Sequence, residues 1–443
     1  MPRGATYTLE IIQLAILFVL RAATSLRSSE TCINLVFEMQ QGKLFQAPTH
    51  TTIQNWILRL GLYELKRPKQ WASDWVWIVD HTIQIGDLKC LLVVGIRASH
   101  WRQLGRPLEH HDLQVLELKP VEKSTGVIVQ QQFTSIAGRC GTPRAVLSDQ
   151  GSDIKKGLQL WQAQQPASSG IIGLSDIAHK VASVLKRILQ GDERWAQYTS
   201  QCGKTKAAIQ QTKLAHLTPP KPKSKARYMN IAEQVRWGTR IGNLLRSHRQ
   251  GALSAEQQEQ LPGELLDKKL GWLDQYKPEL SRWQELSDMG QEICRRIRTE
   301  GYHAGSARLL RTELPVASGG QARQLREEMI AFVASESDKV PAGERLPGSS
   351  EVIESLIGKG KRLEGQQSQS GFTRQVLAMA GSVVKPTHEI IQVALKSFGM
   401  KHLKAWCTKH LPQSVQSKRR RDLGTQKREQ NPNKVHQASM AMV

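Results

Sequence analysis

The chain has 443 residues and is therefore long enough for two or three domains with real cores. Its residues are 39% hydrophobic and 23% charged, which is ordinary for a globular protein. Lys and Arg total 62 against 39 Asp and Glu, a formal net charge of +23. This positive excess favours a polyanionic partner, because each phosphate that the protein neutralises releases condensed counterions.

A membrane surface is the competing polyanion, so the apolar runs decide between the two. One run, Ile11–Leu20, has about half of the ~20 residues that a membrane-spanning helix needs. Charged residues bracket it closely, so we predict a buried helix and no membrane partner, with a secretory leader as the weaker alternative. The six scattered cysteines lack zinc-finger spacing and predict reduced thiols in a cytoplasmic protein.

Residues 1–66 are predicted to form a compact helical domain. A helix over 28–39, a turn at Gly42 and a helix over 53–60 ended by Gly61 have the order of a helix-turn-helix, whose second helix enters the major groove. A plain helical bundle is the alternative, and the basic charge favours DNA. The predicted DNA contacts are His50, Thr51, Gln54 and Asn55.

Strand patterns begin after a linker at Lys66–Lys69. Apolar runs over 75–83, 90–96 and 113–118 predict three strands, a helix follows over 124–137, and a fourth strand runs over 144–149. Asp80 and Asp149 each interrupt or end a buried strand, where an unpaired carboxylate is costly. Two carboxylates at adjacent strand ends suit Mg²⁺, with Asp153 as a rival for the second position.

Further candidates follow a fifth strand. Asp176-Ile-Ala-His179 opens a helix, and Asp176 is a natural N-cap, so both residues could be purely structural. Residues 181–345 are long, polar and mostly helical, and we predict that most of their tryptophans are core residues. Glu354 then lies in a capped helix that begins near Ser349 or Ser350, with Glu351 as its rival in the first turn. 

The order of strands, helix and acids resembles the ribonuclease-H-like core of DDE-type transposases of bacterial insertion sequences. The resemblance implies an α/β fold: a mixed sheet interrupted by a large all-α insertion, with an N-terminal helix-turn-helix. It divides the chain into a DNA-binding domain (1–66), a first part of the catalytic core (70–180), the insertion (181–345), a last part of the core with C-terminal helices (346–412) and a basic disordered tail (413–443).

The resemblance also implies the roles of the site residues. Asp80, Asp149 and Glu354 match the three family acids and would hold two Mg²⁺ ions, for which Mn²⁺ could substitute. Asp176 and His179 match a C/D-x-x-H motif found in several transposase superfamilies, hAT among them, where the His could contact the scissile phosphate. Lys361 matches a basic residue that often follows the last acid, and Arg419 and Arg420 of the tail are further predicted DNA contacts.

The implied reaction is phosphodiester hydrolysis followed by strand transfer at the ends of a mobile element. The implied partners are double-stranded DNA, both terminal repeats and target, and a second copy of the chain in a dimer or larger assembly, in the cytoplasm at the nucleoid. No G-x-x-x-x-G-K-[ST] or G-x-S-x-G motif is present, which argues against a P-loop nucleotidase and a serine hydrolase. A non-enzymatic DNA-binding regulator or an inactive transposase remnant stays as the alternative.

Overall fold

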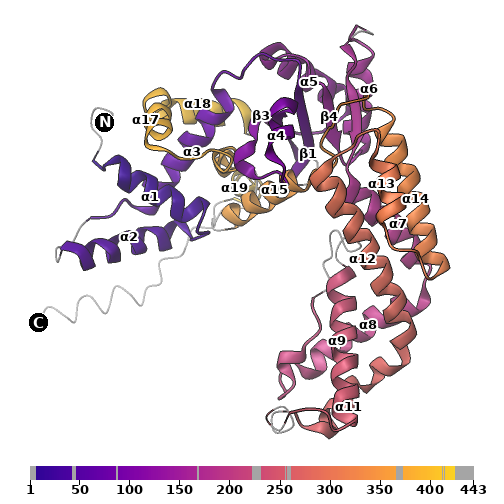
Figure 1. Ribbon diagram of the computed structural model, residues 1–443. Coiled ribbons are helices and arrows are strands. Elements are labelled where there is room, and N and C mark those ends of the chain that lie inside the picture. Colours follow the sequence, from indigo (N-terminus) through magenta and orange to yellow (C-terminus); the bar gives the residue numbers. More distant parts are fainter. Residues whose placement is uncertain are drawn as a thin grey trace, which may run out of the picture.

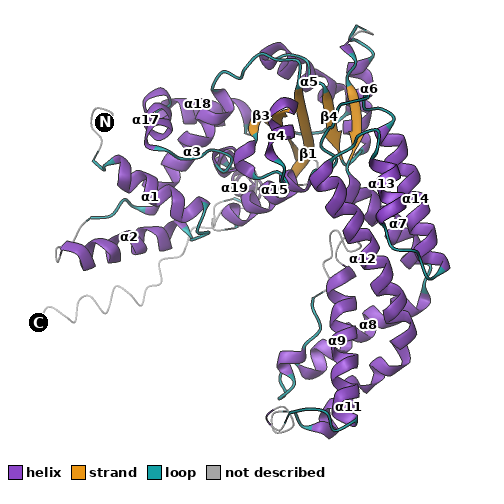
Figure 2. Cartoon of the chain, viewed as in Figure 1, coloured by secondary structure: helices purple, strands orange, loops and turns teal. Residues whose placement is uncertain are grey.

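The computed structural model describes residues 6–41, 46–85, 88–166, 169–221, 231–254, 256, 261–365, 373–411, 413 and 415–424. Its centre is a five-stranded mixed sheet with the strand order β3-β2-β1-β4-β5 (Figures 1 and 2). The strands are β1 (Trp75–Ile85), β2 (Leu88–Arg97), β3 (Gln114–Val121), β4 (Ala145–Ser148) and β5 (Ile172–Ser175). The first three are antiparallel, and β4 and β5 run parallel to β1. The predicted strands are confirmed.

Side chains of β1 alternate between two cores, because successive residues of a strand point to opposite faces. Trp75, Trp77 and Val79 enter one core, which α5 (Gly126–Cys140) and α6 (Ser152–Gln162) cover. The rings of Trp77 and Trp161 stack there at 5.4 Å between centroids. Val76 and Ile78 enter the second, larger core, against which α15 (Glu351–Glu364) packs. The acids described below lie on this second face.

The two ends of the chain form one helical body beside the sheet. The apolar run predicted as a buried helix is α1 (Leu9–Leu20), and it contacts the C-terminal helix α17 (His388–Ser397). The central helix α3 (His50–Lys66) packs against helices from both ends and against β3. The other helices of this body are α2 (Leu26–Gln41), η6 (Arg374–Val376), α16 (Leu377–Gly381) and α18 (Met400–His410). The described residues before Arg67 thus pack together with helices from the C-terminal part of the chain.

Gly61 sets the distance between α3 and α16. It was predicted to end its helix, but α3 continues to Lys66. A Cβ atom at Gly61 would lie 1.9 Å from the carbonyl oxygen of Leu377, so a side chain would force the two helices apart. The glycine serves close helix packing, and the prediction of a helix end there was wrong because the two uses of glycine look alike in sequence.

The predicted linker at Lys66–Lys69 is tightly held. The carboxylate of Glu64, 3% exposed, accepts hydrogen bonds from Lys69 Nζ at 2.7 Å, from Arg67 Nε at 2.5 Å and from the Val115 N–H of β3 at 3.1 Å. Burial lowers the pKa of Lys69 to about 8, against the charge of Glu64. This buried cluster fixes the helical body to the edge of the sheet.

A helical arm extends from the other side of the sheet (Figures 1 and 2). Its described residues form helices and loops, with one isolated bridge between Tyr302 and Leu346. Trp195 and Trp283 are buried and meet edge to face at 4.9 Å, which confirms the predicted core role of these two, whereas Trp237 and Trp272 are partly buried. The arm comprises α7 (Ile177–Gln190), α8 (Glu193–Ile209), η3 (Ala215–Leu217), α9 (Ile231–Arg249), α11 (Gly263–Leu270), η5 (Gly271–Tyr276), α12 (Lys277–Glu300), α13 (Ser306–Glu313) and α14 (Gly320–Ser337).

The remaining elements are short. Helices α4 (Ala98–Leu104) and η1 (His110–Asp112) connect β2 to β3, and α19 (Val415–Leu423) follows the helical body. The prediction of a disordered tail over 413–443 is wrong for Val415–Leu423, where a run of good helix formers makes α19, and residues 425–443 lie outside the described residues. Within the described ranges, no helix is both long and apolar enough to cross a bilayer. All six cysteines are free.

We predict that Gly61→Ala lowers the free energy of unfolding by about 1–3 kcal/mol, because the added methyl overpacks the contact between α3 and α16. The control is Gly138→Ala in α5, where a Cβ meets nothing within 4 Å and the alanine should stabilise the helix by about 0.5–1 kcal/mol. Urea unfolding measures both variants. Equal changes in the two would contradict the close helix contact.

Candidate functional site

Three aspartates lie in one row across the sheet. Val76, Ala145 and Ile172 are register partners on β1, β4 and β5, and Ile78, Leu147 and Leu174 form the next row on the same face. Because side chains repeat every two residues, the following row contains Asp80, Asp149 and Asp176. Asp80 lies in the middle of β1, whereas Asp149 and Asp176 directly follow β4 and β5, and the three carboxylates share the face against which α15 packs.

The pKa of the Asp80 carboxyl lies well above its ordinary value. Burial raises its pKa to about 7, and the charges of Asp149 and Glu354 add to the increase. A hydrogen bond of 2.6 Å from the His81 N–H to Asp80 Oδ1 opposes the shift. A pair of close carboxylates of this kind repels itself until a cation or a proton neutralises it.

A strained turn holds Asp149 at the end of β4. Its Oδ1 accepts a hydrogen bond of 2.8 Å from the Gly151 N–H. Gln150 between them has a φ of +64°, which is uncommon for a residue with a side chain. The Gln150 amide donates to the carbonyl oxygen of Leu174 at 3.2 Å, so a contact with β5 stabilises the unfavourable backbone. Strain of this type gathers at functional sites.

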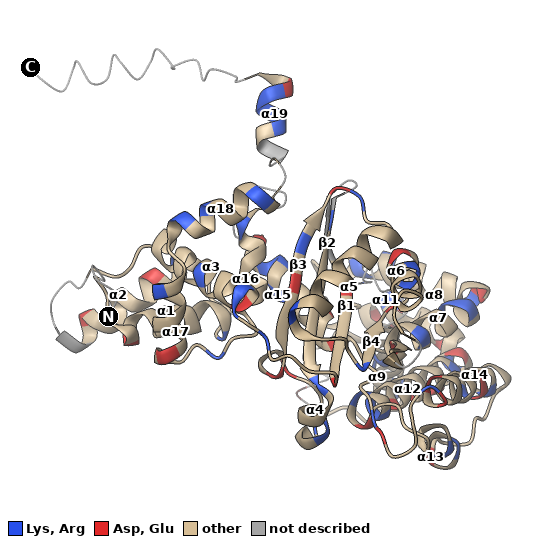
Figure 3. Ribbon diagram, turned by 90° about the horizontal axis from the view of Figure 1, so that it is seen from above, with Lys and Arg blue, Asp and Glu red and all other residues tan. Residues whose placement is uncertain are grey.

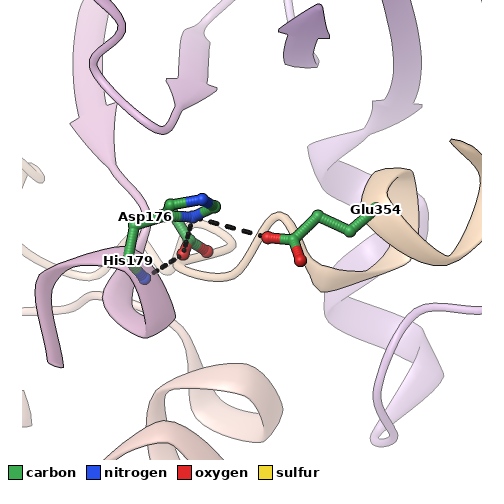
Figure 4. A group of neighbouring side chains, drawn as sticks. All are labelled: Asp176, His179 and Glu354. Atoms are coloured by element: carbon green, nitrogen blue, oxygen red, sulfur yellow. Dashed lines mark hydrogen bonds and ion pairs between the residues drawn. The ribbon is translucent and has the colours of Figure 1, made fainter. Parts of the chain in front are cut away.

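Helix α15 contributes Glu354, the third acid of the predicted metal site. Glu354 lies one turn into the helix, and its Oε1 is 3.4 Å from His179 Nδ1 (Figure 4). That oxygen is buried and accepts no hydrogen bond from any described residue. Burial raises the pKa of Glu354, the charge of His179 lowers it, and Asp176, Glu351 and Asp149 raise it. Glu351 instead is 53% exposed and pairs with Arg298 at 2.6 Å, so of the two rivals Glu354 faces the aspartates.

Asp176 joins the sheet to α15. Its side chain has no exposed surface, and its Oδ2 accepts from the His179 N–H at 2.7 Å as the N-cap of α7. Its Oδ1 accepts from the N–H of Ser350 at 2.6 Å, the residue that precedes α15. The N–H groups of His179 and Ser350 and the ring of His179 therefore surround this carboxylate, and the bond to Ser350 places Glu354 opposite the aspartates.

His179 carries a positive charge at neutral pH. The hydrogen bond of 3.0 Å between its Nδ1 and Asp176 Oδ2 raises its pKa to about 9, against the effect of burial, and the charges of Asp176, Glu354 and Asp149 contribute. Its side chain is 37% exposed. An imidazolium fixed beside carboxylates can donate its other N–H to a phosphate oxygen.

Two sets of residues in this site could hold a metal. Ligand atoms of Asp176, His179 and Glu354 lie within 4.8 Å of one another (Figure 4). The imidazole of His179, however, would have to release its proton to bind a metal, and the oxygens of Asp176 already accept hydrogen bonds from N–H groups. Asp80, Asp149 and Glu354 offer carboxylate oxygens alone, which suit a hard divalent cation, and Oε1 of Glu354, which accepts no hydrogen bond from the described residues, fits this set.

The other predicted residues near the site have different surroundings. Asp153 pairs with Lys89 at 3.2 Å and lies 3.6 Å from His81 Nε2, so it belongs to a separate ion-pair cluster. Lys361 is exposed, seven residues after Glu354, and thus two turns further along α15.

The predicted DNA contacts on α3 are mostly unsuitable. Gln54 is buried, where its Nε2 donates to Gln375 at 3.0 Å and its Oε1 accepts from Arg374, so its prediction as a base contact was wrong. Helix α3 is enclosed by α2, α16, α17, α18 and β3 and cannot enter a groove as a recognition helix does. The remaining residues differ in exposure: His50 bonds to Glu30, Thr51 is exposed and Asn55 is half-buried. Arg419 and Arg420 are exposed, and they belong to α19, which carries basic residues in Figure 3.

Sequence reasoning missed Glu336, a further positioning residue. This buried acid of α14 accepts hydrogen bonds from the Ser175 N–H at 2.9 Å and the Ser175 hydroxyl at 3.2 Å, at the end of β5. The hydroxyl of Tyr302 donates to the carbonyl of Ser175 at 2.9 Å. These contacts anchor the residue before Asp176, and no local sequence signal marks them, because the partners are more than 100 residues apart.

We predict that Asp80→Asn stabilises the metal-free protein at pH 8 by about 2–4 kcal/mol. The folded-state pKa of about 7 exceeds the ordinary value of 3.8, so the charged carboxylate costs free energy that is absent near pH 4, grows as the pH rises and is complete above pH 7. Urea unfolding in EDTA at several pH values measures this effect.

The control for this prediction is Asp153→Asn. Burial raises the pKa of Asp153, but hydrogen bonding to Ser124 and the charges of His81 and Lys89 outweigh it and lower the pKa. Removing that charge should destabilise the protein at pH 8, with a sign opposite to that of Asp80→Asn. A loss of stability in both variants would contradict the crowding of Asp80 and Asp149.

We predict that Asp176→Asn lowers the pKa of His179 from about 9 towards 6.5 and the free energy of unfolding by about 2–4 kcal/mol. The asparagine NH₂ group would face an N–H donor of His179 or Ser350. An NMR titration of the imidazole gives the pKa. The control is Asp288→Asn, which changes an exposed residue of α12 and should leave the pKa of His179 unchanged. An unshifted pKa of His179 in Asp176→Asn would refute the pairing of Asp176 with His179.

Comparisons with known proteins give a structural likeness but no match in sequence. No family model matches the chain, and no curated protein does. Among solved structures, a chain of the Drosophila P element transposase strand transfer complex aligns with it at a TM-score of 0.42 and 11% sequence identity. The alignment covers 88% of this chain and 94% of that chain.

Proposed function

We propose that the chain is a DDE-type DNA transposase that hydrolyses phosphodiester bonds and transfers strands at the ends of a mobile element. One observation carries the proposal: Asp80 in the middle of β1 and Asp149 directly after the parallel strand β4 lie on the face where α15 places Glu354. These are the residues that the resemblance in sequence selected, and their mutual charge effects support a single acidic centre.

The topology supports a ribonuclease-H-like core. Three antiparallel strands, helix α5, and two further strands parallel to the first give a sheet whose central strand is β1. The acids then lie on the central strand, directly after its parallel neighbour and on a helix that packs against the central strand. The helical arm between β5 and α15 accounts for the long separation between Asp149 and Glu354.

Divalent metal fits this centre. Asp80, Asp149 and Glu354 would hold Mg²⁺, and Mn²⁺ would serve as well because it takes the same oxygen ligands. When bound, such ions activate the attacking oxygen and stabilise the leaving oxygen of an in-line displacement. Burial is the main cause of the raised pKa values of Asp80 and Glu354, and a bound cation would favour the charged form of both carboxylates.

The protein supplies positioning and charge around the phosphate. Asp176 orients both α7 and α15, and its hydrogen bonds keep His179 protonated. We propose that the exposed edge of the His179 ring contacts the scissile phosphate or its leaving oxygen, and that Lys361 contacts DNA further along α15. The net charge of +23 supplies the long-range attraction for DNA.

We predict that the protein nicks linear DNA carrying its element ends when Mg²⁺ or Mn²⁺ is present and not in EDTA. Asp80→Asn, Asp149→Asn and Glu354→Gln should each lower the nicking rate by at least about 100-fold, since each removes a metal ligand. Glu351→Gln is the matched control on the same helix and should lower the rate only a few-fold. Gel analysis of end-labelled DNA measures the rates.

The outcomes separate the two candidate functions. Equal nicking by the wild type and Asp149→Asn would refute the assignment of the site. DNA-end binding without nicking by any protein would favour the alternative, a DNA-binding regulator or an inactive remnant. A larger loss in Glu351→Gln than in Glu354→Gln would exchange the roles of the two glutamates.

A further inference from the structure

A cleft beside α15 has cations that no acid neutralises. Its volume is about 510 Å³, and its walls come from the end of α1, from α4, from η1 and from α12 and α15. Arg21 is exposed at the end of α1, and Lys359 is half-buried on α15. Among the described residues, neither side chain forms an ion pair or a hydrogen bond. Both charges thus remain available to a ligand.

The acids of the cleft do not compensate these charges. Glu351 pairs with Arg298 at 2.6 Å, and Glu109 lies 3.7 Å from Arg106. Burial lowers the pKa of Lys359, and the charges of Arg362 and Arg21 lower it further, so these cations repel one another. Burial and the charge of Lys359 also lower the pKa of His110 to about 4, which leaves a neutral ring that can donate one hydrogen bond.

A second cavity borders this cleft and includes one acid of the site in its wall. This second cavity, of about 670 Å³, lies between α7, α9, α12 and α15, and the acid in its wall is Glu354. The ion pair of Arg298 and Glu351 lines both cavities, so it forms the partition between them. On α15, Glu351, Ser355 and Lys359 face the first cavity at a spacing of four residues, which is one side of a helix.

We propose that this cleft binds the phosphodiester backbone of the DNA strand that continues to the acidic centre, with Arg21 and Lys359 as phosphate contacts and His110 as a hydrogen-bond donor. This inference rests on the proposed function, because it takes DNA as the substrate. Two neighbouring cavities that share Arg298 and Glu351 in their walls suit a chain of phosphates better than one free anion does. Lysine, arginine and neutral polar donors are the groups that commonly contact DNA phosphates.

Salt-dependent DNA binding tests the proposal without catalysis. Fluorescence anisotropy would follow a labelled duplex with the full chain in EDTA at several salt concentrations. Arg21→Gln and Lys359→Gln should each reduce the slope of log K against log salt by about 0.9, and the double variant by about twice that, because each phosphate contact releases condensed counterions. Lys268→Gln removes an equal charge from exposed α11, at the far end of the arm, and should leave the slope unchanged (Figure 1).

The outcomes distinguish failure of the cleft proposal from failure of the proposed nuclease. An unchanged slope in Arg21→Gln and Lys359→Gln, or an equal change in Lys268→Gln, would overturn the proposal, while metal-dependent nicking would still stand. A reduced slope without nicking by the wild type would support the cleft and refute the nuclease. A nucleoside triphosphate that displaces DNA from the wild type but not from the double variant would identify a free nucleotide as the ligand and overturn DNA.

Discussion

The carboxylate of Asp176 connects the two parts of the chain that make the site. It ends the row of acids on the sheet, caps α7 and accepts from the N–H of Ser350, where α15 begins. Without a fixed start for α15, Glu354 would have no defined position relative to Asp80 and Asp149. A fully buried carboxylate is stable only if donors surround it, and one of these donors, the Ser350 N–H, lies 174 residues from Asp176 in the sequence. The hydrogen bonds that stabilise this buried charge thus also fix the position of α15 and of Glu354.

The same buried charge separates two roles that sequence reasoning assigned together. Asp176 and His179 were grouped with the catalytic acids, but hydrogen bonds occupy both oxygens of Asp176 and keep His179 protonated. The hydrogen bonds of Asp176 fix the start of α15 and raise the pKa of His179, while Asp80, Asp149 and Glu354 are the acids that would hold the proposed cation. The site therefore has an oxygen-rich side and a cationic side, an arrangement suited to a phosphate between them.

Interpretations from local pattern failed where distant segments meet. Helix α3 has the sequence of a recognition helix, yet α16, α17 and α18 from the other end of the chain cover it, and Gln54 pairs with Gln375. Gly61 resembled a helix end but permits the close contact with α16. Glu336 and Arg21 carried no recognisable signal, because their importance depends on Ser175 and Lys359, which are far away in sequence.

The sequence by itself determined the strands, their order along the chain and the acids within or directly after them. Alternation with a period of two and short apolar runs are local properties, and an aspartate in a buried strand is visible without a fold. Only the tertiary structure decided that the aspartates share one face, that Glu354 and not Glu351 approaches them, and that α3 lies in the core. Strand register and helix packing arise from contacts between residues distant in sequence, so no local pattern contains them.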